Sequence, residues 1–182
     1  MEYCSHYVEL VTSPDQLPQI LGRAIRTAVA RKGVAVVVVP GNVALGPLTK
    51  AVPAWSAPSA PVIRPSNDDV GELARLLNRS SRVTLLCGAG CKDSHTEVIE
   101  LARKLKAPIV HSLRGKEYIE YDNPFDVGMT GLIGFASGYT AMKSCDMLLM
   151  LGSDFPYRLF YPEKVAIAQV DTRAEALGNH AL

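Results

Sequence analysis

The feature that most restricts the fold of this chain is the alternation of short apolar segments with amphipathic ones after residue 65. Strands that alternate with helices favour an open, mostly parallel sheet, because each helix returns the chain across the sheet in a right-handed crossover. We therefore predict an α/β fold with a Rossmann-like sheet and flanking helices. Strands are expected at 82–87, 107–110, 147–151 and 165–170, helices at 66–77, 93–105 and 134–143, and a long loop at 114–131.

The first 45 residues show the same alternation but contain too few elements for a complete domain. Ser13, Pro14 and Asp15 suit a helix start, because they offer a capping hydroxyl, a fixed φ and a negative charge at the helix N-terminus. Helical spacing of apolar residues continues to about Arg31, and the β-branched run at 34–39 is typical of a buried parallel strand. No partner strand is predicted. Residues 1–45 are therefore expected to be a helix-strand remnant of another α/β domain.

The stretch at 46–65 differs in composition from its surroundings. Five prolines lie in it, at positions 47, 53, 58, 61 and 65. Each proline disfavours helix in the residue before it, so we expect a semi-extended linker, with Trp55 packed against a neighbouring domain. The domain at 66–182 is expected to be incomplete at its C-terminus, because the chain ends soon after a strand. The sequence is thus expected to be a fragment.

Composition excludes several classes of protein. The chain has 19 Lys and Arg against 18 Asp and Glu, a formal net charge of +1, which argues against a strongly basic nucleic-acid binder. No apolar run approaches the roughly 18 residues of a transmembrane helix, and the N-terminus lacks the pattern of a signal peptide. Four cysteines are too few for a disulfide scaffold. We therefore expect a cytoplasmic chain with reduced thiols and no membrane segment.

Three glycine-containing loops follow predicted strands. In open α/β sheets, ligands bind outside the carboxyl ends of the strands, where these loops should gather. Gly88-Ala-Gly90 has the shape of a dinucleotide-binding turn, but Asp93 occupies the place of the third glycine, so nucleotide contact and a plain tight turn both remain possible. The loop at 128–134 offers a threonine hydroxyl and free amides for a phosphate or sugar hydroxyl. The third loop, at 151–156, follows its strand directly.

Other polar residues add less to the site. Asp171 closes the last strand, where a carboxylate suits the hydroxyl pair of a ribose, and Arg114 is either an anion contact or a solvated loop residue. Cys87 and Cys91 lack the further ligands that a zinc site needs, so two buried thiols are expected and no metal site is assigned. We assign no catalytic residue. The four histidines, expected on the surface or hydrogen-bonded in the core, are His6, His95, His111 and His180.

Several segments resemble the bacterial thiamine- and flavin-dependent pyruvate dehydrogenase (quinone) family, also called pyruvate oxidase. They are the runs at 111–135, 151–162 and 86–91, and the segment at 4–45 looks like the end of that family's pyrimidine-binding domain. Acetolactate synthases share the architecture, but the runs at 121–125 and 155–158 favour the pyruvate enzyme. The resemblance implies a central FAD-binding domain between two domains that hold thiamine diphosphate and Mg²⁺, within a homotetramer.

The resemblance also implies which residues contact FAD. The first loop supplies Thr130, Gly131, Leu132 and Ile133, and the second supplies Gly152, Ser153, Asp154, Phe155 and Pro156. Asp171 corresponds to the acid that holds the adenosine ribose, and the weaker correspondences are Gly88, Gly90 and Arg114.

Three features of the family do not occur in this sequence. They are the glutamate that activates thiamine, the Gly-Asp-Gly…Asn motif that holds Mg²⁺ and the diphosphate, and the C-terminal segment through which full-length members associate peripherally with the inner membrane. We therefore expect the chain to bind FAD through its ADP half without catalysing pyruvate oxidation alone. The alternatives are a non-catalytic interaction module that pairs with a separately encoded remainder, the central domain of an acetolactate synthase, and a degraded gene without function.

Overall fold

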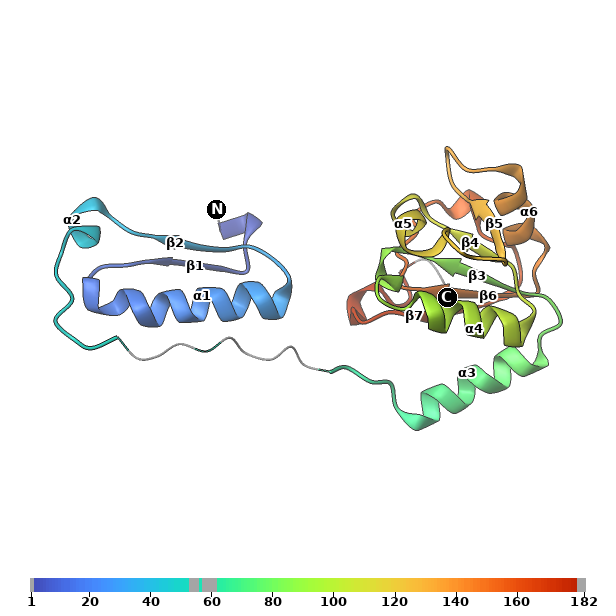
Figure 1. The fold of residues 1–182 in the computed structure, drawn as a ribbon, viewed down its shortest axis with the longest axis horizontal. Coiled ribbons are helices and arrows are strands. Elements are labelled where there is room, and N and C mark those ends of the chain that lie inside the picture. The colour runs from blue at the N-terminus through green and yellow to red at the C-terminus, as the bar shows by residue number, and fades with distance from the viewer. Residues whose placement is uncertain (1, 53–55, 57–61, 180–182) are drawn as a thin grey trace. The chain divides into compact units, whose positions relative to one another are not determined.

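The computed structural model describes residues 2–52, 56 and 62–179 (Figure 1). The chain divides into two compact units, Met1–Val62 and Ile63–Leu182. The expected packing of Trp55 and the part of the proline-rich linker at 53–55 and 57–61 lie outside the described residues.

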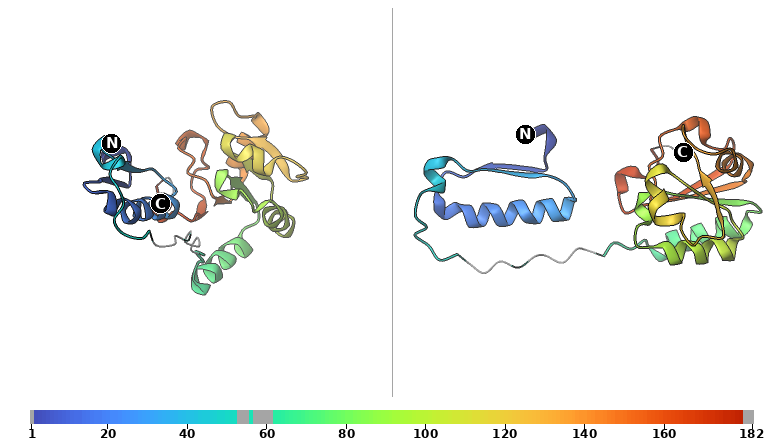
Figure 2. Two further views of the ribbon diagram at one scale, coloured as in Figure 1. Left: turned by 60° about the vertical axis from the view of Figure 1, so that its left-hand side comes forward. Right: turned by 45° about the horizontal axis from the view of Figure 1, so that its top comes forward.

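The first unit is a two-stranded parallel sheet covered on one face by a helix. The strands are β1 (Tyr7–Leu10) and β2 (Ala35–Val38), and the helices are α1 (Leu17–Arg31) and the single turn α2 (Gly41–Ala44). Figure 2 shows α1 lying along one face of the two strands. The small core under this helix consists of Val11, Ile20 and Val43. The predicted helix to Arg31 and the strand within 34–39 are confirmed, but the expectation that this strand is buried is wrong, since none of its residues is buried and Val38 is 45% exposed.

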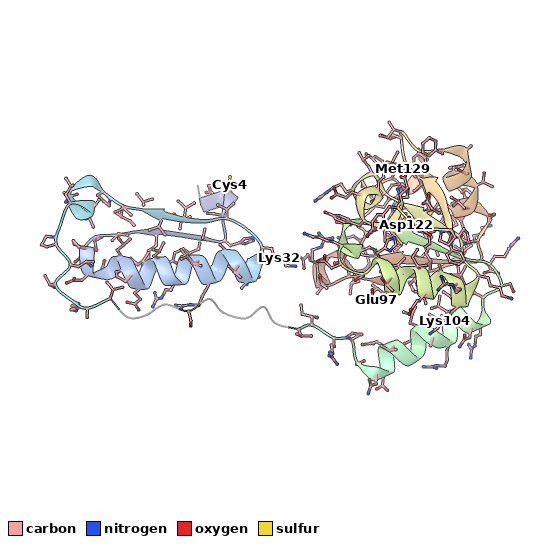
Figure 3. All side chains as sticks on the ribbon, in the orientation of Figure 1. Cys4, Lys32, Glu97, Lys104, Asp122 and Met129 are labelled. Atoms are coloured by element: carbon pink, nitrogen blue, oxygen red, sulfur yellow. The ribbon has the colours of Figure 1, made fainter. Side chains whose placement is uncertain are left out.

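The prediction that this strand lacks a partner is wrong. Tyr7 of β1 pairs with Ala35 of β2, and the pairing continues in parallel to Leu10 and Val38. β1 was not predicted, because a segment of four residues that includes an acidic one shows no clear periodicity of apolar residues. α1 ends at Lys32, which adopts a left-handed conformation with φ of 47° and lets the chain turn back toward β2 (Figure 3).

The face of the two strands opposite α1 is apolar and exposed. Side chains alternate between the faces of a strand, so Val8 and Leu10 of β1 lie beside Val36 and Val38 of β2 on the uncovered face. Val8 is 41% exposed, Leu10 53% and Val38 45%. Parallel sheets are normally covered on both faces, so this unit has an apolar surface without a partner in residues 2–52.

The second unit is a five-stranded sheet in which all neighbours run parallel. Its strands are β3 (Val83–Cys87), β4 (Ile109–His111), β5 (Asp126–Met129), β6 (Met147–Leu151) and β7 (Ala166–Val170). Their order across the sheet is β5-β4-β3-β6-β7. The predicted open α/β sheet is confirmed. No helix in the described residues is both long and apolar enough to cross a membrane.

Helices flank this sheet on both faces (Figure 1). The helices are α3 (Asn67–Arg79), α4 (His95–Leu105), the single turn α5 (Lys116–Ile119) and α6 (Ala136–Ser144). Apolar residues of α3, α4 and α5 pack with one face of the central strands, and Met142 of α6 packs with the other face. All five residues of β3 are buried, so the two cores meet across the central strands.

The expected long loop at 114–131 is replaced by three short elements. A 3-10 turn at Leu113–Gly115, α5 and β5 occupy most of it. β5 forms the edge of the sheet, and its register with β4 shifts between Ile109 and His111, where Gly128 takes a φ of 95°. Elements of three or four residues, one of them bulged at a glycine, have no measurable periodicity, so the sequence did not indicate them.

The turns that follow β3 and β6 touch each other through glycine backbone. A Cβ at Gly88 would lie 2.3 Å from the carbonyl oxygen of Gly152, and a Cβ at Gly90 would lie 2.6 Å from the Gly152 Cα. Gly152 itself has a φ of 54°. No other residue type permits this approach, because a Cβ would overlap backbone atoms that cannot move independently.

We predict that Gly152→Ala lowers the free energy of unfolding by about 2–4 kcal/mol, combining left-handed strain with overpacking. The measurement is urea unfolding followed by far-UV circular dichroism. Gly71→Ala in α3 is the matched control, because a Cβ there meets no atom within 4 Å. That variant should be stabilised by roughly 0.5–1 kcal/mol. Equal effects of the two substitutions would contradict the interlocking of the turns.

Candidate functional site

The five parallel strands of the second unit end at one edge of the sheet, and the segments that follow them gather there. The strand order reverses between β3 and β6, because the chain builds β4 and β5 on one side of β3 before crossing to the other. Ligands of open α/β sheets bind at such a switch point. The residues that follow the strands include Gly88, Arg114, Thr130, Gly152 and Asp171.

The amides of the first glycine turn are used inside the fold. Gly88 N–H donates to the Leu151 carbonyl at 2.9 Å, and Gly90 N–H donates to the Gly152 carbonyl at 2.9 Å. These two amides therefore hold the β3 turn against the β6 turn. A phosphate at this edge would need other donors, so the geometry favours the tight-turn interpretation of Gly88 and Gly90.

The loop after β5 contains an unsatisfied hydroxyl beside free amides. Thr130 is 3% exposed, and its Oγ1 has no hydrogen-bond partner among the described residues. The next three residues, Gly131, Leu132 and Ile133, donate no backbone hydrogen bond within the described part of the chain. Gly131 takes a φ of 117° and starts the turn that Gly134 N–H closes at 2.9 Å. Such a turn offers donors to an anionic or hydroxyl-rich ligand.

The loop after β6 packs against the loop after β5. Phe155 is 5% exposed, and a Cβ on Gly131 would lie 3.4 Å from its ring. Tyr161 Oη donates a hydrogen bond of 2.6 Å to the Phe155 carbonyl. Burial, and then the negative charge of Asp154, raises the pKa of Tyr161 to about 12. Two of the three predicted loops are thus held together by one aromatic ring.

Apolar side chains around these loops face solvent. Leu132 is 73% exposed and Ile133 67% exposed, although both are large and apolar. Phe135, two residues after Ile133, and Leu159, in the segment after β6, are exposed as well. Exposed apolar groups next to free amides are the combination that a ligand with an apolar ring and a polar tail requires.

Asp171 lies at the carboxyl end of β7, as predicted, but its carboxylate already has a partner. Arg173 N–H donates to Oδ1 at 2.9 Å, and the Arg173 guanidinium lies 3.3 Å from the same oxygen. The side chain of Asp171 is only 8% exposed. A sugar hydroxyl at this carboxylate would share it with Arg173.

Arg114 follows β4 and lies beside an open hollow of about 410 Å³. The lining residues are Ala89, Leu113, Arg114, Lys116, Glu117 and Tyr118. The hollow thus lies between the β3 turn and α5. It adds two cationic side chains to the carboxyl edge of the sheet.

The two cysteines near the β3 turn are buried and interact with each other. A side-chain hydrogen bond with Cys91, and then burial, raises the pKa of Cys87, whereas the same interaction lowers the pKa of Cys91. The Cys91 thiol lies 3.2 Å from the Leu151 carbonyl. No group of three metal-ligating side chains suited to a metal ion occurs among the described residues.

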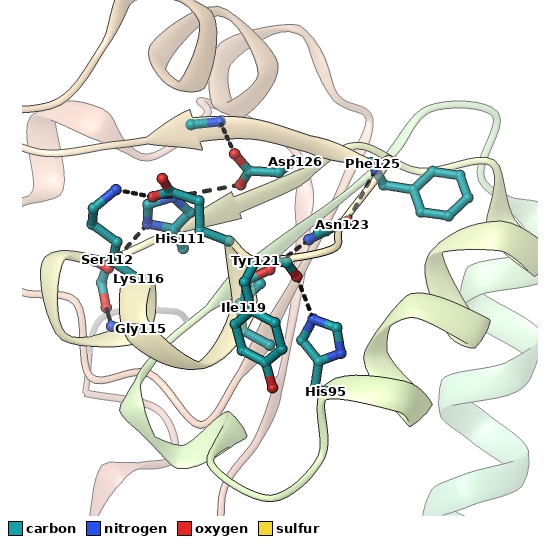
Figure 4. A network of polar contacts seen from close by, with 12 residues as sticks. His95, His111, Ser112, Gly115, Lys116, Ile119, Tyr121, Asn123, Phe125 and Asp126 are labelled. Atoms are coloured by element: carbon teal, nitrogen blue, oxygen red, sulfur yellow. Dashed lines mark hydrogen bonds and ion pairs between the residues drawn. The ribbon is translucent and has the colours of Figure 1, made fainter.

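His111 is a site residue that the sequence did not single out. Its imidazole is fully buried at the end of β4, where Nε2 lies 3.4 Å from a carboxylate oxygen of Glu120 and 3.4 Å from one of Asp126, which Figure 4 labels. Histidine alone is a weak signal, and both carboxylates lie in the segment that was expected to be a loop. Only the fold brings the three side chains together.

We predict that Tyr161→Phe lowers the free energy of unfolding at pH 7 by about 1–2 kcal/mol, because the Phe155 carbonyl loses its donor. A phenol whose pKa rises on folding stabilises fully below its ordinary pKa of 10 and loses that contribution as pH approaches 12. The difference between wild type and variant should therefore shrink between pH 10 and 12 in urea titrations. Tyr3→Phe, at a fully exposed tyrosine, is the control. A pH-independent difference would contradict this role.

The chain is similar in sequence to a known protein family and to several known proteins. A family model for the thiamine pyrophosphate enzyme, central domain, matches residues 70–181. The chain is 61% identical over 181 residues to the "Uncharacterized 42.6 kDa protein in isoamylase 3'region" of Pseudomonas amyloderamosa, which covers 98% of this chain and 46% of that protein.

Two further curated relatives carry functional names. The "Putative thiamine pyrophosphate-containing protein YdaP" of Bacillus subtilis (strain 168) is 34% identical over 171 residues, 93% of this chain and 30% of that protein. An acetolactate synthase of Mycobacterium bovis is 29% identical over 184 residues, 94% of this chain and 30% of the enzyme. The chain thus spans less than half the length of each of these relatives. The family match covers most of the second unit, and the chain belongs to the thiamine pyrophosphate enzymes, whose central domain it contains.

Proposed function

We propose that this chain is the FAD-binding central portion of a thiamine diphosphate-dependent pyruvate dehydrogenase (quinone), which converts pyruvate to acetate and CO₂ and passes electrons to ubiquinone. The observation that supports FAD most directly is the buried Thr130 hydroxyl without a partner, next to the free amides of Gly131–Ile133. A diphosphate needs a group of such donors. FAD, when bound, supplies the acceptor for two electrons.

The described residues fit an extended ligand of this kind. Thr130 and the amides after it are suited to the diphosphate, and the exposed side chains of Leu132 and Ile133 to the apolar face of the ring. Gly152 and Phe155 fix the neighbouring loop. Asp171, shared with Arg173, is suited to the ribose. In this proposal the protein binds and orients the cofactor and performs no proton transfer.

The remainder of the activity belongs to parts that this sequence does not include. The thiamine-activating glutamate and the Mg²⁺ motif do not occur in it, so we propose that the purified chain binds FAD without oxidising pyruvate. Thiamine diphosphate and Mg²⁺ would be held by other domains or subunits of a homotetramer in the cytoplasm. No nucleic acid is expected as a partner.

The first test is a titration of the purified chain with FAD, followed by flavin fluorescence, with ADP as competitor. We expect saturable binding that ADP displaces, because the polar half of the cofactor meets the Thr130 loop. Thr130→Val keeps the side-chain shape and removes the hydroxyl, and should weaken binding by roughly tenfold. Thr84→Val is the matched control, since Thr84 is equally buried but bonds to the Ala141 carbonyl on α6. Absence of FAD binding by a folded sample would reject the proposal.

A second measurement separates the pyruvate enzyme from the acetolactate synthase alternative, which the Mycobacterium bovis relative favours. The tagged chain is isolated from its own cells and assayed with pyruvate, thiamine diphosphate, Mg²⁺ and a soluble quinone. Quinone reduction with acetate formation supports the proposal. Formation of acetolactate without quinone reduction would assign the chain to the alternative.

The second candidate function, a non-catalytic interaction module, is favoured by the open face of β1 and β2. Val8, Leu10 and Val38 expose apolar side chains there, and both strands have an unpaired edge. We expect the purified chain to self-associate in sedimentation runs at tens of micromolar, because another copy covers this face when no partner is present. Val8→Thr/Leu10→Thr should reduce that association, whereas Leu21→Thr, at a similarly exposed residue of α1, should not. A wild-type chain that stays monomeric at every concentration would argue against the module.

A further inference from the structure

The described residues contain two buried polar atoms that face each other without a hydrogen bond. They are His111 Nε2 and Asp126 Oδ1, 3.4 Å apart. His111 is completely buried, and its other nitrogen, Nδ1, lies 3.3 Å from the carbonyl of Ser112. Buried polar atoms without partners are rare in folded proteins, so this pair requires a physical explanation, such as a change in the protonation of one of its groups.

A second carboxylate completes the arrangement, as Figure 4 shows. Glu120 Oε2 also lies 3.4 Å from His111 Nε2, and the ammonium group of Lys116 contacts the same oxygen. Lys116 and Glu120 come from α5 and the residue after it, Asp126 from β5, and Cys87 of β3 is the register partner of His111. These are the titratable groups nearest the imidazole, and the elements packed around it also carry Glu117 and Tyr118 on α5 and Tyr139 and Lys143 on α6.

The charge on the imidazole decides how strongly these elements are joined. At 3.4 Å a neutral imidazole makes no proper hydrogen bond to either carboxylate, since such bonds are normally 2.7–3.2 Å long. A protonated imidazole donates from Nε2 and attracts both carboxylates, in charge-assisted bonds that are shorter and about twice as strong. Burial raises the pKa of Asp126, so its negative charge is costly until a cation lies beside it.

We propose that His111 acts as a proton-operated clasp that, when protonated, ties α5 and β5 to the end of β4. When the imidazole is neutral, Glu120 is held by Lys116, and α5 stays on the sheet through its apolar contacts, chiefly the buried Ile119, but opens more readily. α5 forms one wall of the hollow lined by Arg114 and Tyr118. The proton on His111 therefore sets the shape of a hollow at the ligand-binding edge of the sheet, whichever ligand binds there.

Amide hydrogen exchange of the unliganded full chain tests the clasp without reference to FAD. The amides of Gly115 and Lys116 bond to the Ser112 carbonyl, and the amide of Glu120 bonds to the Lys116 carbonyl, so they report opening of the 3-10 turn and of α5. We expect their protection factors, which remove the intrinsic pH dependence of exchange, to rise about fivefold or more from pH 8 to pH 5, because protonation of His111 closes the clasp. Amides of β6 serve as the internal reference.

Three variants separate the clasp from general effects of pH. Glu120→Gln removes a carboxylate at a partly exposed residue and should reduce the pH response, while His111→Gln should abolish it. His95→Gln is the control, because His95 stacks on Tyr121 near the same turn but has no carboxylate contact of this kind. A flat wild-type profile, or a response retained in both Glu120→Gln and His111→Gln, would overturn the proposal. If His111→Gln fails to fold, Glu120→Gln decides the question alone.

Discussion

The second unit depends on a contact between two stretches of bare backbone. Gly88 and Gly90 after β3 meet Gly152 after β6 at distances that exclude any side chain. This contact joins the half of the sheet that contains β4 and β5 to the half that contains β7. It also fixes the direction in which the chain leaves β6, and so places Phe155 against the loop after β5. The candidate ligand site is assembled around this contact.

The sequence indicated those elements in which the spacing of apolar residues agrees with the capping and turn residues at the ends of the element. β6 occupies the predicted residues 147–151, and α3 begins after Ser66, whose hydroxyl accepts the Asp69 amide as a capping residue should. The elements that were not indicated are short and contain polar residues or glycine. β1 and β5 have four residues each, and they are strands because the neighbouring strands β2 and β4 offer them an edge to pair with. Tertiary pairing of this kind leaves no local signal.

The sequence predicted which loops form the candidate site, but not which of their donor and acceptor atoms are free to bind a ligand. Because parallel strands share one carboxyl edge, the loops at Thr130 and Gly152 were placed correctly beside each other. Which donors remain free depends on residues far along the chain. Gly90 N–H is taken by the Gly152 carbonyl, and the Asp171 carboxylate by Arg173. His111 could be recognised as a site residue only in the structure, because α5 and β5, which were not predicted, bring Glu120 and Asp126 beside it.

The strand order has a consequence for how the unit forms during synthesis. β3 acquires β4 on one edge soon after it is made, but its other edge pairs with β6, in a register that joins Val83 to Met147. All five residues of β3 are buried in the folded unit, so until β6 leaves the ribosome an apolar strand has one edge unpaired. Contacts between residues so distant in sequence form slowly, because a long loop must close first. The nascent chain is therefore most exposed to mispairing in the interval between the synthesis of β3 and that of β6.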